Sequence, residues 1–135
     1  TPQRSTTGYN SKRLNMLLAV LEKRAAIQLS NKDVFLNITG GIKSEDPSLD
    51  LAIVSAILSS YHDTPLNEKV CFASEIGLSG ELRPVIKLDQ RISEAEKLGY
   101  EVFVTSNFRN ENVKIKRIKI LELEKIGSLI ANLFK

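Results

Sequence analysis

The stretch Asp46-Pro-Ser-Leu-Asp-Leu-Ala-Ile-Val-Ser-Ala-Ile-Leu58 decides the fold that this sequence predicts. Asp46 is a good helix N-cap, and Pro47 stands at the first helical position, where its missing N–H removes no hydrogen bond. From the fourth residue of the stretch onward, only Asp50 and Ser55 interrupt an apolar run. A helix that is apolar on most of its faces is buried between other elements. The stretch therefore predicts the central helix of a hydrophobic core.

Helices and strands alternate on both sides of this helix. An earlier helix is expected after Asn10 or Ser11, because apolar residues recur there on one helical face from Leu14 to Ala25. A later helix at residues 89–98 is expected to turn three residues inward, Ile92, Ala95 and Leu98, and to stop at Gly99. The remaining pattern predicts strands at 34–38, 70–76, 81–86, 101–105 and 114–121, a helix at 122–134, and loops at 1–9 and 107–112.

The length and composition are those of one compact domain. The chain has 135 residues, 42% hydrophobic and 26% charged, and no apolar run approaches the roughly 18 residues of a membrane helix. The order of elements predicts a single α/β (α+β) domain over residues 1–135, with a mixed sheet packed against helices. Thr1 at the start and Met16 as the only methionine indicate a piece of a longer protein. The absence of a signal pattern and the single cysteine favour the cytoplasm.

Scarce residue types exclude several kinds of chemistry. One cysteine, Cys71, excludes an internal disulfide and a multi-cysteine zinc site, and one histidine, His62, excludes a metal site built on a histidine pair. No metal site is predicted. Gly40-Gly41-Ile42-Lys43-Ser44 lacks the glycine that precedes the lysine of a P-loop, so no ATP site is predicted there. The chemistry that remains is serine with lysine, carboxylates, or surface binding.

Charge is distributed unevenly along the chain. The formal net charge of +3 is the sum of a basic start (+4 over residues 1–28), an acidic middle (−3 over 29–64 and −1 over 65–100) and a basic end (+3 over 101–135). If the two ends meet in the fold, they would form one positive face suited to phosphate. The alternative is a solvated surface on which lysines serve solubility.

Ser48 is the hydroxyl in the most suggestive position. It lies in the first turn of the predicted central helix, where free N–H groups and the helix dipole would stabilise an anion. A serine nucleophile needs a base, and here that base would have to be a lysine with a lowered pKa. The alternative is that serine is common in the first turn of a helix.

Four segments, taken in order, resemble the C-terminal domain of the RadA (Sms) family of bacterial DNA repair proteins. They are Gly8-Tyr-Asn-Ser-Lys-Arg-Leu-Asn-Met-Leu-Leu-Ala-Val-Leu-Glu-Lys-Arg24, Asp33-Val-Phe-Leu-Asn-Ile-Thr-Gly-Gly41, Asp46-Pro-Ser-Leu-Asp-Leu-Ala52 and Glu75-Ile-Gly-Leu-Ser-Gly-Glu-Leu-Arg-Pro84. That domain resembles the proteolytic domain of Lon protease, so the resemblance implies a Lon-protease-like (ribosomal protein S5 domain 2-like) fold. The family fold begins with a β-hairpin ahead of the first helix, which implies that opening strands are missing here.

The resemblance also implies the setting of the domain. The parent protein would be a DNA-dependent ATPase or helicase with an upstream zinc finger and a RecA-like core, forming homohexamers that act in recombination and branch migration on DNA. ATP, magnesium and zinc would be bound upstream, and this chain itself would hold no cofactor. Recombinase or replication proteins would be further partners, and ring assembly would use the helical faces and the acidic middle.

The comparison with Lon predicts a degenerate peptidase site. Lon-type peptidases carry the nucleophile in a Pro-Ser-Ala-Gly stretch, and Pro47-Ser48 keeps only its first half. Their catalytic lysine follows Pro-Ile-Gly-Gly-Leu, and ungapped alignment on Pro84 puts Asp89 at that position. A carboxylate cannot serve as the neutral amine that deprotonates serine. The domain is therefore expected to be a non-catalytic pseudo-protease; the alternative is an active Ser-Lys peptidase in which Lys87, two residues earlier, replaces the lysine.

The leading expectation is an oligomerisation and DNA-contacting domain, on single-stranded or branched DNA. Contacts with phosphates would come from basic residues near both ends of the chain, which are Arg4, Lys12, Arg13, Lys114, Lys116, Arg117 and Lys119. Such contacts give affinity without reading sequence. A third possibility is that the domain only assembles the ring.

Overall fold

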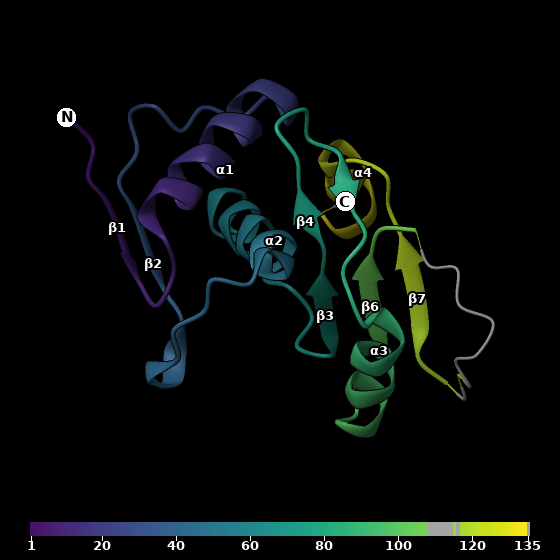
Figure 1. The fold of residues 1–135 in the computed structure, drawn as a ribbon. Helices are drawn as coiled ribbons and strands as arrows, with labels where there is room; N and C mark the ends of the chain where they lie inside the picture. Colours follow the sequence, from purple (N-terminus) through teal and green to yellow (C-terminus); the bar gives the residue numbers. More distant parts are fainter. Residues whose placement is uncertain (108–114, 116, 135) are drawn as a thin grey trace.

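The computed structural model describes residues 1–107, 115 and 117–134. The helices are α1 (Ser11–Arg24), α2 (Asp50–Tyr61), α3 (Leu88–Lys97) and α4 (Ile126–Leu133) (Figure 1). The strands are β1 (Arg4–Thr7), β2 (Val34–Asn37), β3 (Val70–Ala73), β4 (Glu75–Ile76), β5 (Leu82–Arg83), β6 (Val102–Thr105) and β7 (Lys119–Glu122). Two short 3₁₀ turns, η1 (Thr39–Gly41) and η2 (Pro47–Leu49), lie between β2 and α2. This mixture of helices and strands confirms the predicted α/β (α+β) class.

The strands of the described residues form three small sheets. β3, β6 and β7 make a parallel sheet in that order, so β6 is central and β3 lies at one edge. β1 and β2 pair in parallel as a separate two-stranded ribbon, and β4 and β5 form an antiparallel pair. Two of the three parallel pairings are joined through a helix, as is usual for parallel strands: α1 connects β1 to β2, and α3 lies in the connection from β3 to β6.

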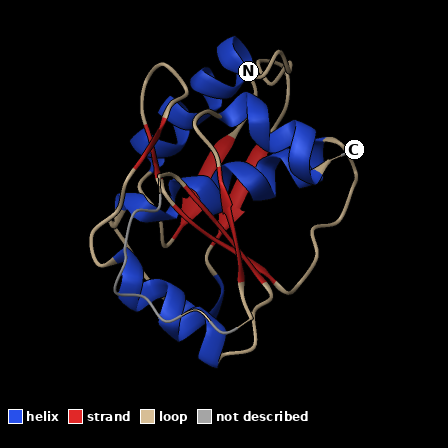
Figure 2. Ribbon diagram, turned by 90° about the vertical axis from the view of Figure 1, so that its right-hand side faces the viewer, coloured by secondary structure: helices blue, strands red, loops and turns tan. Residues whose placement is uncertain are grey.

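The three-stranded sheet is covered on both faces (Figure 2). Phe103 belongs to a small apolar cluster with Ile92 and Ala95 of α3, whereas its neighbour Val104 belongs to the large cluster of α1, α2 and α4. Successive side chains of a strand point to opposite faces, so neighbouring side chains of β6 pack into different clusters on the two faces of the sheet. The result is a helix–sheet–helix arrangement in which α2 lies in the larger layer.

α2 is the central helix that the apolar stretch predicts. Five of its side chains, from Leu51 to Leu58, are buried apolar residues of the large cluster. Asp46 is the N-cap as expected, since its carboxylate accepts a hydrogen bond of 2.9 Å from the Ser48 N–H. The first turn is the 3₁₀ turn η2, and the α-helix itself begins at Asp50.

Several predicted boundaries are wrong, most of them because of a longer-range contact. Residues 1–9 contain β1 instead of being all loop, because Arg4–Thr7 pairs with β2. The expected single strand at 70–76 is divided at Ser74, whose N–H donates to the Ser48 carbonyl and whose hydroxyl donates to the Arg83 carbonyl. Residues 81–86 hold only the two-residue β5, and Pro84, which has no N–H for a ladder, follows it.

The second half of the chain differs in a similar way. Leu98 is 67% exposed instead of buried, because α3 ends at Lys97 and Gly99 adopts a positive φ. The expected helix at 122–134 begins only at Ile126, since β7 extends to Glu122 and the Leu123 N–H still bonds to the Thr105 carbonyl. The expected strand at 114–121 is described only from β7 onward, and its beginning lies outside the described residues.

Candidate functional site

The start of α2 is fixed by hydrogen bonds to the end of β3. The Ser74 N–H donates to the Ser48 carbonyl at 3.0 Å, and the Leu51 N–H donates to the Ser74 carbonyl at 3.1 Å. Ser48 is 5% exposed. The backbone of the predicted nucleophile, Ser48, is therefore held in place on both sides by these hydrogen bonds, and its hydroxyl faces α3.

An arginine, Arg91 of α3, holds the Ser48 hydroxyl. Its Nη1 lies 3.0 Å from Ser48 Oγ, its Nη2 lies 3.2 Å from Asp46 Oδ2, and its Nε donates to the Ile86 carbonyl at 2.9 Å. The hydrogen bond from the Ser48 N–H, followed by those from the Ser48 hydroxyl and Arg91, lowers the pKa of the Asp46 carboxyl despite partial desolvation. A guanidinium stays protonated at any physiological pH, so it donates hydrogen bonds and accepts no proton from serine.

Asp89, which the Lon comparison puts at the lysine position, and Lys87, its possible substitute, lie at the start of α3. Lys87 precedes the helix with a left-handed backbone (φ 56°), and its side chain is exposed. Asp89 Oδ1 accepts a hydrogen bond of 2.9 Å from the Gln90 N–H, within its own turn. Within the described part of the chain, Arg91 donates to the Ser48 hydroxyl, and neither Lys87 nor Asp89 has a hydrogen bond to it.

Sequence reasoning missed Arg91. Lys87 is the N-cap of α3 and has a left-handed backbone, whereas Arg91 lies within the helix. Because α3 packs near the start of α2, Arg91 reaches the serine instead of Lys87.

A second polar group lies beneath the first turn of α2. The Asp50 carboxylate is fully buried and accepts hydrogen bonds from the Tyr9 hydroxyl (2.8 Å), Arg13 Nε (2.7 Å) and the Ile76 N–H (3.0 Å). Arg13 also pairs with it through Nη2, and the Glu75 carboxylate lies 3.6 Å from the same nitrogen. Burial, reinforced by the Asp50 carboxylate, raises the pKa of the Tyr9 phenol. This network ties α1, α2 and β4 together.

The structure does not bring the two predicted groups of DNA-contacting residues together. β1, which carries Arg4, and β7, which carries Lys119, lie at opposite sides of the molecule (Figure 1). Lys12 is exposed at the start of α1, and Arg117 is exposed beside α3, where its N–H donates to Glu96 Oε2. Lys114 and Lys116 lie outside the described residues.

Two residues of the N-terminal group have internal partners. Arg4 is half-buried, and one of its guanidinium nitrogens donates to the Leu29 carbonyl at 2.6 Å. Arg13 forms the two-pronged pair with Asp50. A phosphate at Arg13 would have to compete with a buried carboxylate, so Lys12 is the freer cation of this group.

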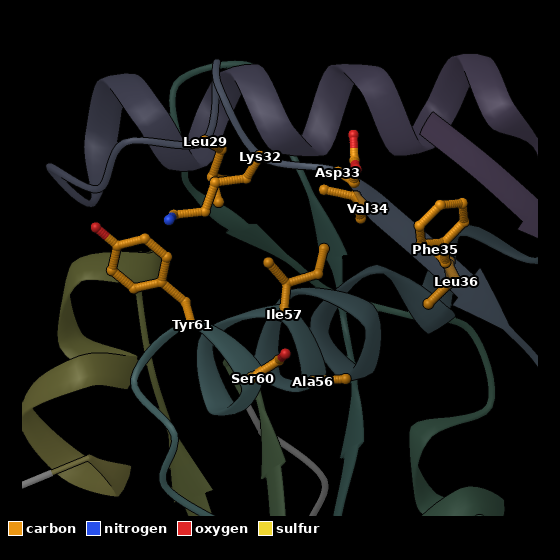
Figure 3. Close-up of a pocket in the computed structure, with 10 residues that line it drawn as sticks. All are labelled: Leu29, Lys32, Asp33, Val34, Phe35, Leu36, Ala56, Ile57, Ser60 and Tyr61. Atoms are coloured by element: carbon orange, nitrogen blue, oxygen red, sulfur yellow. The ribbon is translucent and has the colours of Figure 1, made fainter. Parts of the chain in front are cut away.

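A pocket of about 310 Å³ lies between α2 and β2 (Figure 3). Its walls are Leu29, Lys32, Asp33, Val34, Phe35, Leu36, Ala56, Ile57, Ser60 and Tyr61. Lys32 and Tyr61 lie at one end and Phe35 at the other. Phe35 is 67% exposed and Tyr61 36% exposed, which is unusual for large aromatic side chains.

None of the helices in the described part of the chain has the length and hydrophobicity of a membrane-spanning segment.

Comparisons with known proteins place the chain in a family. A family model described as subunit ChlI of Mg-chelatase matches residues 10–108. The DNA repair protein RadA of Streptococcus pneumoniae is 41% identical over 98% of this chain and 32% of its own length. RadA of Bacillus subtilis is 48% identical over 74% of this chain, and RadA of Listeria monocytogenes is 40% identical over 95% of it; the matches cover 22% and 28% of those proteins. The chain thus spans about a third or less of each relative. It belongs to the family described as subunit ChlI of Mg-chelatase, and it matches the C-terminal region of the bacterial DNA repair protein RadA.

Proposed function

We propose that this chain is a non-catalytic domain that contacts DNA and holds copies of a DNA repair protein together. The relatives that match nearly its whole length are named DNA repair proteins, which supports a role in repair. In this proposal the parent protein is a homohexameric ATPase that acts in recombination and branch migration. ATP, magnesium and zinc are bound elsewhere in that longer protein, and recombinase or replication proteins are further partners.

The contact between Arg91 and Ser48 is the observation that carries the non-catalytic part. Nucleophilic catalysis by serine needs a neutral base within hydrogen-bond reach of the hydroxyl. Here that place is taken by a guanidinium that is itself paired with Asp46. The same contacts have a structural purpose, since they link α3 to the start of α2 and so join the two apolar clusters.

A peptidase assay tests this part of the proposal. The full chain is incubated with an unfolded protein substrate, alongside Ser48→Ala and the exposed-serine control Ser79→Ala. We expect no hydrolysis above background in any of the three. Hydrolysis by the wild type that Ser48→Ala abolishes and Ser79→Ala retains would establish the rival function, an active Ser-Lys peptidase of Lon type.

DNA binding tests the second part. Positively charged side chains that neutralise phosphates make affinity fall steeply with salt, whatever the DNA sequence. We expect the full chain to bind single-stranded or branched DNA at low salt, with an affinity that falls as salt rises. If no DNA of either kind is bound at low salt, the DNA-contacting role is wrong and only the assembly role remains.

Light scattering on the full chain tests the assembly role. A closed ring would give a mass that is an integral multiple of the monomer mass of 15.0 kDa and stays constant on dilution over the range tested. A monomer at every concentration would remove assembly from the functions proposed for this chain.

A further inference from the structure

The β1–β2 ribbon has one face toward the core and one face toward solvent. The strands pair in register as Ser5 with Phe35 and Thr7 with Asn37, and these four side chains are all exposed. The intervening residues point the other way, where Val34 and Leu36 pack against the large apolar cluster. The exposed face thus presents one aromatic ring among two hydroxyls and a carboxamide.

From these observations we propose that the exposed face of the β1–β2 ribbon binds single-stranded DNA, with a base stacked on Phe35. The inference rests on the proposed function and narrows it to one DNA form and one surface. Base–aromatic stacking is a major source of single-strand binding, and an exposed ring on a strand offers a flat platform for it. Duplex DNA keeps its bases inside the stack, so Phe35 has no base to contact there.

Basic side chains flank the ribbon at both ends. Lys32 precedes β2 and lies at the end where the strands begin. At the other end the segment around Lys43 runs beside Gly8, because the Ser44 N–H donates to the Gly8 carbonyl at 2.9 Å. Lys12 follows shortly after in the first turn of α1. A strand laid along the ribbon would therefore meet cations before and after the aromatic platform.

The acids near the ribbon only partly offset these cations. Asp33 and Glu45 are the carboxylates on the flanking segments, and Asp33 Oδ1 accepts a hydrogen bond of 2.7 Å from the Gln3 N–H. Three exposed lysines, Lys12, Lys32 and Lys43, against these two acids leave the surface positive. Tyr61, at the other end of the pocket from Phe35, is a further exposed ring near this surface.

The polarity of the face argues against a second copy of the chain as its occupant. Stable protein interfaces bury about 800 Å² per partner around an apolar centre. Here three of the four exposed side chains of the ribbon are polar. A phosphodiester chain with stacking bases fits a surface of hydroxyls, an amide, an aromatic ring and flanking lysines better.

Phe35→Ala tests the proposal by fluorescence anisotropy with a labelled oligothymidylate. Stacking on one aromatic ring is worth about 1–3 kcal/mol, so we expect binding of the full chain to weaken about 5- to 150-fold. Phe35→Tyr should keep most of the affinity.

The salt dependence of the affinity provides a second test. It should be unchanged in Phe35→Ala, which removes no charge, and shallower in Lys32→Glu. Leu78→Ala, which truncates another highly exposed apolar residue away from the ribbon, is the matched control and should bind as the wild type.

A direct reading of stacking comes from Phe35→Trp. The chain contains no tryptophan, so this variant carries a single indole at the site. We expect its fluorescence to be quenched by oligothymidylate and not by a duplex of the same length. Wild-type binding that persists undiminished in Phe35→Ala, or an indole that single strands leave unquenched while they bind, would overturn the ribbon as the site.

Other outcomes separate this inference from the proposed function. If the wild type binds no DNA, the proposed DNA contact itself fails and the ribbon inference fails with it. If the wild type binds DNA and Phe35→Ala binds equally well but has a lower mass by light scattering, the face is an interface between copies and the inference alone is overturned.

Discussion

At the scale of single residues, the chain uses its polar side chains to fasten elements to one another. Asp50 interrupts an apolar run in the sequence, and in the fold it receives hydrogen bonds from Tyr9, Arg13 and the Ile76 N–H. A buried carboxylate is tolerated only when it is paired and fully hydrogen-bonded, and both conditions hold here. Such a buried ion pair adds little to the net free energy of folding, but removing one partner leaves the other charge buried and unpaired, which is strongly destabilising.

Removing the Asp50 carboxylate should therefore be severely destabilising. Asp50→Ala leaves the Tyr9 hydroxyl, the Ile76 N–H and the Arg13 guanidinium without their shared acceptor, and we expect a loss of about 3 kcal/mol or more. Urea unfolding followed by circular dichroism measures the change. Glu68→Ala, which truncates an exposed carboxylate, is the control and should change stability by less than about 0.5 kcal/mol. Equal stability of the two variants would show that the network contributes nothing to folding.

The same network predicts a loss of stability in alkali. Burial first, and then the Asp50 carboxylate, raises the pKa of the Tyr9 phenol in the folded protein. The unfolded chain therefore releases the Tyr9 proton at lower pH than the folded one, starting near the ordinary tyrosine pKa of about 10. The contribution of Tyr9 is complete below that pH and is lost as the pH rises above it.

Urea unfolding of wild type and Tyr9→Phe between pH 8 and 11 checks this sign. Phenylalanine has no proton to release, so the difference in the free energy of unfolding between the two proteins should shift in favour of the variant above pH 10. A constant difference across the whole range would contradict the raised pKa.

The candidate serine site shows what residue-level reasoning from sequence can and cannot reach. Asp46 as the N-cap and Ser48 in the first turn of the helix followed from local chemistry, and both are confirmed. That Asp89 serves its own turn also agrees with its position at a helix start. Arg91 was missed because its contact with Ser48 spans 43 residues and depends on how α3 packs, which no local pattern specifies.

At the scale of elements, long apolar periodicity was the reliable signal and short polar segments were not. α1 buries one apolar stripe and α2 buries most of its surface, and the positions of both helices were predicted to within a few residues. β1 has the sequence Arg-Ser-Thr-Thr, with no apolar residue, and is a strand only because β2 offers it hydrogen-bond partners. The break at Ser74 has the same origin, since its N–H is taken by the Ser48 carbonyl of η2.

The turn from β1 to α1 yields a prediction with a matched control. Gly8 and Gly41 both have positive φ, 87° and 69°, so alanine is strained at either. A Cβ at Gly8 would lie 2.4 Å from the Ile42 carbonyl oxygen, whereas a Cβ at Gly41 would meet nothing within 4 Å. We expect Gly41→Ala to lose about 1 kcal/mol and Gly8→Ala to lose at least about twice that, because backbone must also move. Thermal unfolding of both variants measures the difference, and equal losses would place the strain in φ alone.

At the scale of the whole molecule, the fold keeps the two basic ends of the chain apart. Two basic ends around an acidic middle were compatible with one positive face, but β1 and β7 lie at opposite sides (Figure 1). Net charge by segment says nothing about where segments pack, because packing is set by the apolar faces. The class of the fold was predictable from those faces, and the arrangement of the charges on it was not.

This separation has a consequence for DNA binding that short oligonucleotides can test. Lys12 lies beside the end of the β1–β2 ribbon, whereas Arg117 lies beside α3 at the other side of the molecule. A short oligothymidylate bound along the ribbon meets only the first group. Lys12→Glu should weaken its binding and reduce the slope of log affinity against log salt by about 1, while Arg117→Glu should leave both unchanged. Each variant reverses one exposed charge, so each is the other's control for net charge. A loss caused by Arg117→Glu and not by Lys12→Glu would move the contact to the side of β7 and α3, and equal losses in both would mean that the short strand binds by overall charge without a preferred surface.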